Sequence, residues 1–232
     1  METKIVVFDF DGTLSRVDKG FNCWNALWTA LDALEVDIKY YNMYINKEIT
    51  YSKWCEIIEE EFIARKVNKK LVEDIGKKIK LQGNIEEFLK LLKDSGVKIY
   101  ILSGGIKNMI QASLGELVKY ITDIQADYFS YDEMGFITSL NLCEGHTIEN
   151  KDEFVNLLIK QYQILPEQLL FVGNGLNDET VYKTGVRTLC VNPDGANYDN
   201  KDIWHNVLWT EDLLDVLPYV TKVKEDNNDI IK

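Results

Sequence analysis

The sequence predicts an α/β protein with a doubly wound, mostly parallel sheet and an inserted helical unit. Short apolar runs rich in β-branched residues, at 5–8, 98–102, 169–172 and 186–191, alternate with stretches of helical periodicity. This alternation is typical of parallel strands covered by helices on both faces. Between the first two runs, residues 15–82 show helical periodicity only, which indicates that the helical unit is inserted after the first strand.

Composition favours a soluble globular protein and excludes some partners. The 232 residues carry 38 acidic and 26 basic side chains, a net charge of −12, which argues against nucleic acid and anionic membranes as partners. Neither a signal peptide nor a transmembrane run is evident, so we expect a cytoplasmic protein. Its cysteines lack C-x-x-C spacing, and reduced thiols are favoured over disulfides or zinc ligands for Cys23, Cys55, Cys143 and Cys190.

The first apolar run ends in two carboxylates. In KIVVFDFDGTL, residues 4–14, Asp9 and Asp11 close the strand, and Gly12 and Thr13 form a turn whose amides could face an anion. Crowded carboxylates repel unless a cation lies between them, and Mg²⁺ accepts one or two carboxylates together with a substrate phosphate. The alternative is an ordinary strand end, because Asp and Gly commonly stop strands.

Three helices are expected in the insert from apolar residues at helical spacing. The residues that define them are Trp24, Leu27, Trp28 and Leu31, then Trp54, Ile57, Ile58 and Phe62, then Val72, Ile75 and Ile79. The aromatic members could line a pocket for a ring or a quaternary ammonium, but simple core packing is favoured. These aromatic residues are Trp24, Trp28, Tyr40, Tyr44 and Trp54.

A helix and a second strand follow the insert. Asn84 and Glu87 resemble a capping box before a helix that ends at 95–96, and the run 98–102 is the strand. Ser103, Gly104 and Gly105 then lead into another helix, and such a turn can seat an anion. A plain strand-to-helix turn is the alternative.

The remaining segments continue the alternation. Short strands are expected around a turn at 132–135, and Asn150 with Glu153 predicts a helix cap that places Lys151 in the first turn. A cation at a helix N-terminus is unfavourable because it opposes the helix dipole, and a nearby anion would reverse that cost. The alternative interpretation of Lys151 is an ordinary surface lysine. The strand 169–172 ends in GNGLND, residues 173–178, and a helix follows. We further expect a turn at 192–195, an edge strand at 207–209, a helix at 211–217 and a frayed tail at 222–232.

The order of these motifs resembles the haloacid dehalogenase superfamily of aspartate-nucleophile phosphohydrolases across nearly the whole chain. The motifs occur in the order D-F-D-G-T-L, a Ser after an apolar strand, a Lys and G-N-G-L-N-D. The strings that look most like the phosphoserine phosphatase branch are ILSGG, GNGLND and NKEITYSKW. The resemblance implies a Rossmann-like core domain of residues 1–14 and 83–232 with a helical cap domain of residues 15–82.

The resemblance also implies roles for individual residues. Asp9 would form an aspartyl-phosphate, and Asp11 would act as acid and base. Ser103 would hold a phosphoryl oxygen, and Lys151 would neutralise charge at the nucleophile. The phosphate-binding set would be Gly12, Thr13, Ser103, Gly104, Gly105 and Lys151. Mg²⁺ would be held by Asp9, Asp11, Asn174 and Asp178. The implied reaction is hydrolysis of a small phosphorylated metabolite, and no protein partner is evident.

One residue departs from the family pattern. Asn174 stands where the fourth motif usually has Asp, and an amide ligand without charge predicts weaker Mg²⁺ affinity. Asn174 leaves open one alternative function, a catalytically weakened phospholigand-binding or regulatory protein. A phosphotransferase is a separate alternative. Arg16 or Asp18 could meet a substrate acid or amine, but the branch's usual Glu is not evident, so the phosphomonoester is not assigned. His146 and His205 have no partner pattern, and we expect structural or surface roles for them.

Overall fold

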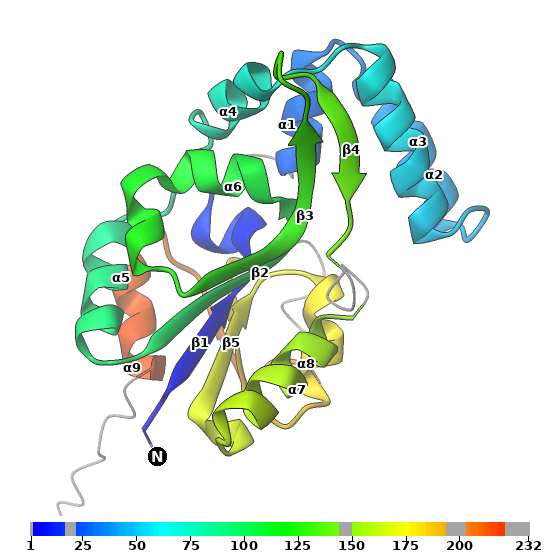
Figure 1. Ribbon diagram of the computed structural model, residues 1–232. Coiled ribbons are helices and arrows are strands. Elements are labelled where there is room, and N and C mark those ends of the chain that lie inside the picture. Colours follow the sequence, from blue (N-terminus) through cyan, green and yellow to red (C-terminus); the bar gives the residue numbers. More distant parts are fainter. Residues whose placement is uncertain (1, 17–21, 144–149, 194–202, 221–232) are drawn as a thin grey trace, which may run out of the picture.

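A seven-stranded sheet forms the centre of the protein, in the order β4-β3-β2-β1-β5-β6-β7 (Figure 1). The structure is a computed structural model that describes residues 2–16, 22–143, 150–193 and 203–220. Neighbouring strands are parallel except β3 and β4, which are antiparallel. This confirms the doubly wound, mostly parallel sheet. The strands are β1 (Ile5–Phe8), β2 (Lys98–Ile106), β3 (Asp123–Tyr131), β4 (Ile137–Asn141), β5 (Leu169–Gly173), β6 (Arg187–Val191) and β7 (Asn206–Leu208).

Strand β1 is apolar throughout because both faces of the sheet are covered. Its alternate residues enter different cores: Val6 and Phe8 pack on one side, Ile5 and Val7 on the other. The first core includes helices α5 (Ile85–Asp94) and α6 (Lys107–Leu114), and the second includes α7 (Lys151–Tyr162) and α8 (Glu179–Tyr182), as Figure 1 shows. The carboxyl end of β1 therefore opens between two layers of helices.

Within the described part of the chain, four α-helices lie between β1 and α5. They are α1 (Cys23–Ala30), α2 (Leu34–Ile45), α3 (Tyr51–Ala64) and α4 (Lys69–Gly76). Side chains of Asn22, Thr50 and Asn68 cap the first, third and fourth of them. The core interpretation of the tryptophans is confirmed, because Trp24, Trp28 and Trp54 are buried, whereas Tyr40 and Tyr44 are half-buried.

The helical insert is bonded to the β3–β4 hairpin. The amide of Ile137 donates to the carbonyl of Val67 (2.9 Å), and the amide of Leu140 donates to Glu59 Oε2 (2.6 Å). In Figure 1 the hairpin rises beside α1 and α3. These bonds cross the predicted boundary between cap and core, and the division into two domains stays a prediction.

Local details differ from the sequence-based expectations. Strand β2 continues through Ser103, Gly104 and Gly105, with a register shift against β3 between Leu102 and Ile106, so these residues do not form a strand-to-helix turn. Neither Asn84 nor Asn150 makes a side-chain capping bond to its helix.

The carboxyl-terminal elements are also shifted. The helix expected at 211–217 is instead a 3₁₀ turn, Leu213–Val216, followed by α9 (Leu217–Val220). Residues 194–195 of the expected turn, the tail 222–232, Asp18 and His146 lie outside the described residues. His205 is exposed and contacts the Thr188 hydroxyl through Nδ1 at 2.8 Å, a structural role as expected.

All four cysteines are free thiols, as the sequence predicted: Cys23, Cys55 and Cys190 are buried and Cys143 is half-buried. Among the helices of the described ranges, none has the length and apolar character needed to cross a membrane.

Candidate active site

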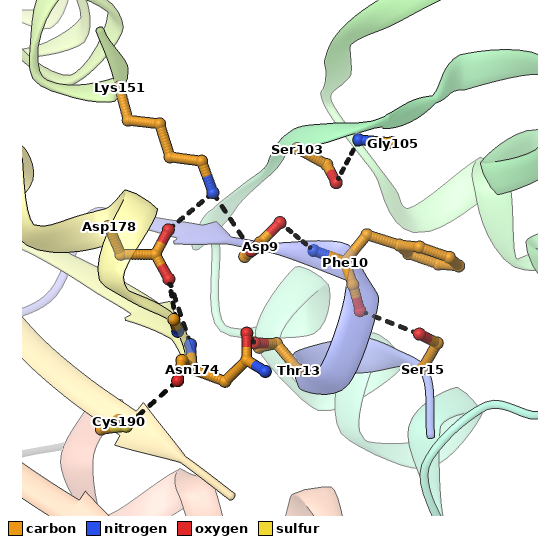
Figure 2. Close-up of polar contacts among 11 residues, drawn as sticks. Asp9, Phe10, Thr13, Ser15, Ser103, Gly105, Lys151, Asn174, Asp178 and Cys190 are labelled. Atoms are coloured by element: carbon orange, nitrogen blue, oxygen red, sulfur yellow. Dashed lines mark hydrogen bonds and ion pairs between the residues drawn. The ribbon is translucent and has the colours of Figure 1, made fainter. Parts of the chain in front are cut away.

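Three ionisable side chains meet at the carboxyl end of β1. Asp9 follows the strand directly, Lys151 is the first residue of α7, and Asp178 follows β5. Lys151 Nζ lies 3.1 Å from Asp9 Oδ2 and 2.6 Å from Asp178 Oδ1, with all three side chains buried (Figure 2). Burial alone lowers the pKa of Lys151, but the charges of Asp178 and Asp9 outweigh it and raise that pKa overall. Lys151 is therefore an ammonium held between two carboxylates and not a surface lysine.

Asp178 organises the turn that follows β5. Its Oδ2 accepts hydrogen bonds from the amides of Asn174 and Gly175, both at 3.1 Å. A Cβ atom at residue 173 would lie 2.3 Å from the same oxygen, so the glycine there lets the carboxylate approach the backbone. Burial raises the pKa of Asp178 to about 6, although Lys151 opposes the shift. Both oxygens of Asp178 thus accept bonds from the protein.

Asp11 is held by the first turn of α1. Its Oδ1 accepts hydrogen bonds from the amide of Cys23 (3.2 Å) and from the Cys23 thiol (3.3 Å). Burial, and then the charge of Asp9, raise the pKa of Asp11 to about 7, while the bonds from Cys23 oppose that rise. A carboxyl with this pKa can give up or take up a proton near neutral pH.

The loop after Asp9 packs against the turn after β5. Phe10 donates its amide to Asp9 Oδ1 at 2.6 Å, and Gly12 adopts φ +80°, a conformation that favours glycine. A Cβ atom on Gly12 would lie 2.1 Å from Asn174 Nδ2, so the two turns touch. Thr13 Oγ1 also donates to Asn174 Oδ1, over a long 3.5 Å.

Ser103 and the two glycines after it lie on β2, the strand next to β1. Ser103 is buried, and its Oγ accepts a hydrogen bond from the amide of Gly105 at 3.1 Å, which leaves the hydroxyl hydrogen available as a donor (Figure 2). A Cβ atom at Gly105 would lie 3.0 Å from Asp11 Oδ2, so the end of β2 also borders Asp11. The indole Nε1–H of Trp24 donates a hydrogen bond to the carbonyl of Gly104 at 2.8 Å.

Sequence reasoning missed the contribution of α1 to this site. Cys23 binds Asp11 and Trp24 binds the carbonyl of Gly104, so two consecutive residues contact two different parts of the site. The sequence predicts only a reduced, buried thiol at Cys23 and only a core or pocket aromatic at Trp24. The one available signal was the Asn22 cap that starts α1 shortly after the loop.

A magnesium site would draw on oxygen atoms at this edge of the sheet. Within the described ranges, no group of three or more His, Cys, Asp or Glu side chains is arranged to hold a metal. Mg²⁺, however, commonly uses one or two carboxylates and takes its other ligands from water and substrate. The carboxylate of Asp9, the carbonyl of Asp11 and the Oδ1 of Asn174 stay predicted ligands: the loop after Asp9 contacts Asn174 at Gly12, while the oxygens of Asp9 already face Phe10 and Lys151. Direct ligation by Asp178 stays a prediction, because its oxygens accept bonds from Lys151 and two amides.

Comparisons with known proteins give the family and support the fold. A model of the haloacid dehalogenase-like hydrolases matches residues 3–181. A phospho-aspartyl intermediate analogue of phosphoserine phosphatase superposes with a TM-score of 0.70 at 18% identity, covering 95% of this chain and 100% of its own. An apo phosphoserine phosphatase gives a TM-score of 0.72 at 20% identity with the same coverage. At these identities the likeness shows the fold. The comparison with curated proteins gave no match.

Proposed function

The chain belongs to the haloacid dehalogenase-like hydrolase family, and we propose that it is a Mg²⁺-dependent phosphatase for a small phosphomonoester, acting through an aspartyl-phosphate on Asp9. One observation carries the proposal. The Asp9 carboxylate lies buried at the end of β1, 3.1 Å from the ammonium of Lys151. A carboxylate placed in this way can attack phosphorus while the lysine neutralises charge on the phosphoryl oxygens.

The first chemical step would use both aspartates. An Asp9 oxygen bonds to phosphorus as the bond from phosphorus to the leaving oxygen breaks, and protonated Asp11 gives its proton to that oxygen. Ser103 donates its hydroxyl hydrogen to a phosphoryl oxygen, and Lys151 holds another. The pKa of Asp11, raised to about 7 by burial and by Asp9, supports this role because the proton is still present near neutral pH.

The second step returns the enzyme to its starting state. Asp11, now ionised, takes a proton from water, and the resulting hydroxide attacks phosphorus and releases Asp9 with inorganic phosphate. When bound, Mg²⁺ would supply positive charge to the phosphoryl oxygens. The residues proposed to hold it are Asp9, the carbonyl of Asp11, Asn174 and Asp178.

Hydrolysis of p-nitrophenyl phosphate with added Mg²⁺ tests the proposal. We expect turnover by the wild type, its loss in Asp9→Asn with an unchanged circular dichroism spectrum, and normal turnover in Asp94→Asn, a surface control paired with Lys90. Mass spectrometry of acid-quenched wild-type protein should find phosphate on Asp9. Full activity of Asp9→Asn would show that Asp9 is not the nucleophile.

Asn174 favours a second candidate, a phospholigand-binding protein with weakened catalysis. Its amide oxygen brings no charge to the proposed metal site. Absence of turnover in the wild type, together with its appearance in Asn174→Asp, would support this candidate over the phosphatase. Loss of free phosphate on adding an alcohol or sugar acceptor would instead indicate a phosphotransferase.

A further inference from the structure

The peptide unit between Gly104 and Gly105 makes two hydrogen bonds that leave it in opposite directions. Its carbonyl oxygen accepts a bond from the indole Nε1–H of Trp24 at 2.8 Å. Its N–H donates to Ser103 Oγ at 3.1 Å (Figure 2). The peptide bond is trans, so the two groups lie on opposite sides of the unit. Trp24 therefore holds one end of the same unit that orients the Ser103 hydroxyl with its other end.

The strand alone does not fix the orientation of this peptide unit. Glycine stands on both sides of it, so no Cβ atom restricts its rotation. The pairing of β2 with β3 also shifts register between Leu102 and Ile106, so the segment lacks the regular ladder found elsewhere in the strand. A rotated unit would present its carbonyl oxygen to the Ser103 hydroxyl, which would then donate to the protein. The same oxygen would repel a phosphoryl anion.

The indole of Trp24 is held in place by its own neighbours. Trp24 is 7% exposed, and its ring packs against three others with centroid separations of 6.2 Å to Trp54, 6.4 Å to Phe62 and 6.3 Å to Phe129. The first two of these rings belong to α3 and the third to β3. An indole fixed in this way keeps its N–H on the Gly104 carbonyl before any ligand binds, so the bond is preorganised.

We propose that Trp24 is a positioning residue for the phosphate site: its N–H fixes the Gly104–Gly105 peptide so that the Ser103 hydroxyl donates to a phosphoryl oxygen. The inference deepens the proposed phosphatase function and rests on the role of Ser103 in it. Trp24 acts through Ser103 and does not touch the reacting atoms. Loss of its N–H should therefore weaken binding of a phosphoryl group, whether a substrate carries that group or it is free phosphate.

The affinity of the full-length protein for inorganic phosphate tests this inference without requiring turnover. Isothermal titration calorimetry with Mg²⁺ present compares wild type, Trp24→Phe and Trp28→Phe. Trp28 is the matched control, because it is a fully buried tryptophan of the same helix whose Nε1 has no hydrogen-bond partner within the described ranges. We expect Trp24→Phe to bind phosphate about fivefold more weakly than wild type, and Trp28→Phe to stay within about twofold.

A double-mutant cycle with Ser103→Ala distinguishes positioning from a general loss of packing. If Trp24 acts through the Ser103 hydroxyl, Trp24→Phe should weaken phosphate binding by no more than about twofold once that hydroxyl is absent. A second variant replaces Trp24 by 3-benzothienylalanine, which keeps both rings and exchanges the N–H for sulfur. This variant should reproduce the fivefold loss with the ring packing retained, and it decides the matter if Trp24→Phe does not fold.

Three results would overturn the inference. The first is an unchanged phosphate affinity in the benzothienylalanine variant, and the second is an equal loss in Trp24→Phe and Trp28→Phe. The third is a loss in Trp24→Phe that is the same with and without the Ser103 hydroxyl. A wild type that binds no phosphate would overturn it as well. Wild-type turnover of p-nitrophenyl phosphate alongside any of these results would leave the phosphatase intact. The expected affinities in a protein without turnover would support the positioning role of Trp24 and argue against the phosphatase.

Discussion

Substitution of Lys151 by methionine tests the charge arrangement of the site. Lys151 Nζ lies 2.6 Å from Asp178 Oδ1 and 3.1 Å from Asp9 Oδ2, and all three side chains are buried. Without the ammonium, two buried carboxylates lose their counter-ion, which should lower the free energy of unfolding by about 3–5 kcal/mol. Methionine keeps an unbranched stem of similar size, so little of the loss comes from packing.

The loss should depend on pH. Burial raises the pKa of Asp178 to about 6 even beside Lys151, and removing that cation raises the pKa further. Asp178 in the folded variant then binds a proton more tightly than in the unfolded chain, where the pKa of Asp is about 3.9. The free energy of unfolding of the variant therefore increases as the pH falls from the raised folded pKa towards about 3.9. We expect the free energy of unfolding, measured by urea denaturation, to differ strongly between Lys151→Met and wild type at pH 8 and less at pH 5.

Two further variants control the interpretation. Lys160→Met changes an exposed lysine of the same helix and should alter the free energy of unfolding by no more than about 0.5 kcal/mol. Lys151→Met combined with Asp178→Asn removes one of the unpaired carboxylates and should recover part of the loss. If Lys151→Met is no more destabilising than Lys160→Met at pH 8, the ammonium does not neutralise the two carboxylates as described.

Three other substitutions have defined outcomes. Asp11→Asn should abolish turnover yet stabilise the fold, with a gain that grows from about pH 4 to pH 7, because the folded pKa of Asp11 is raised to about 7; denaturation curves that show no such gain contradict this. Cys23→Ala removes the thiol bond to Asp11 and should cost about fivefold in kcat, because Asp11 is the proposed acid of the first step and base of the second; an unchanged kcat would argue against a role through Asp11. Gly12→Ala forces an L side chain to φ +80° and 2.1 Å from Asn174 Nδ2, so thermal denaturation should report a loss of about 1–3 kcal/mol; a neutral effect would mean that the loop rearranges freely.

The sequence predicted the sheet and the approach of distant residues because both follow from parallel topology. The apolar run 5–8 is buried on both faces, and its carboxyl end meets those of its neighbours at one edge. Helix α7 leads into β5, which is parallel to β1, so α7 begins at this same edge and Lys151 pairs with Asp9 although the two are far apart in sequence. The pattern of buried strands thus identified the edge at which the polar side chains gather.

Details that depend on tertiary contacts were not predictable. Asn84 has the sequence of a helix cap, but its side chain donates to Asp212 Oδ2 at 2.7 Å, a partner that local spacing cannot reveal. Ser103, Gly104 and Gly105 have the composition of a turn, yet β2 continues through them, and Trp24 Nε1 binds the carbonyl of Gly104. The bonds of Cys23 to Asp11 likewise need the fold to bring α1 against the loop.

The hydrogen bonds between the helical insert and the β3–β4 hairpin have a consequence for chimaeric proteins. Val67 and Glu59 accept amides of β4, and Lys69 donates its amide to the carbonyl of Gly135 at 2.8 Å. A transplant of residues 15–82 alone into a relative would leave these donors and acceptors without their partners. Residues 123–127 of β3 pair with β2 in the sheet, whereas the hairpin pairing with β4 begins at Tyr128. We therefore expect swaps that move the four helices together with residues 128–141 to fold more readily than swaps that move residues 15–82 alone.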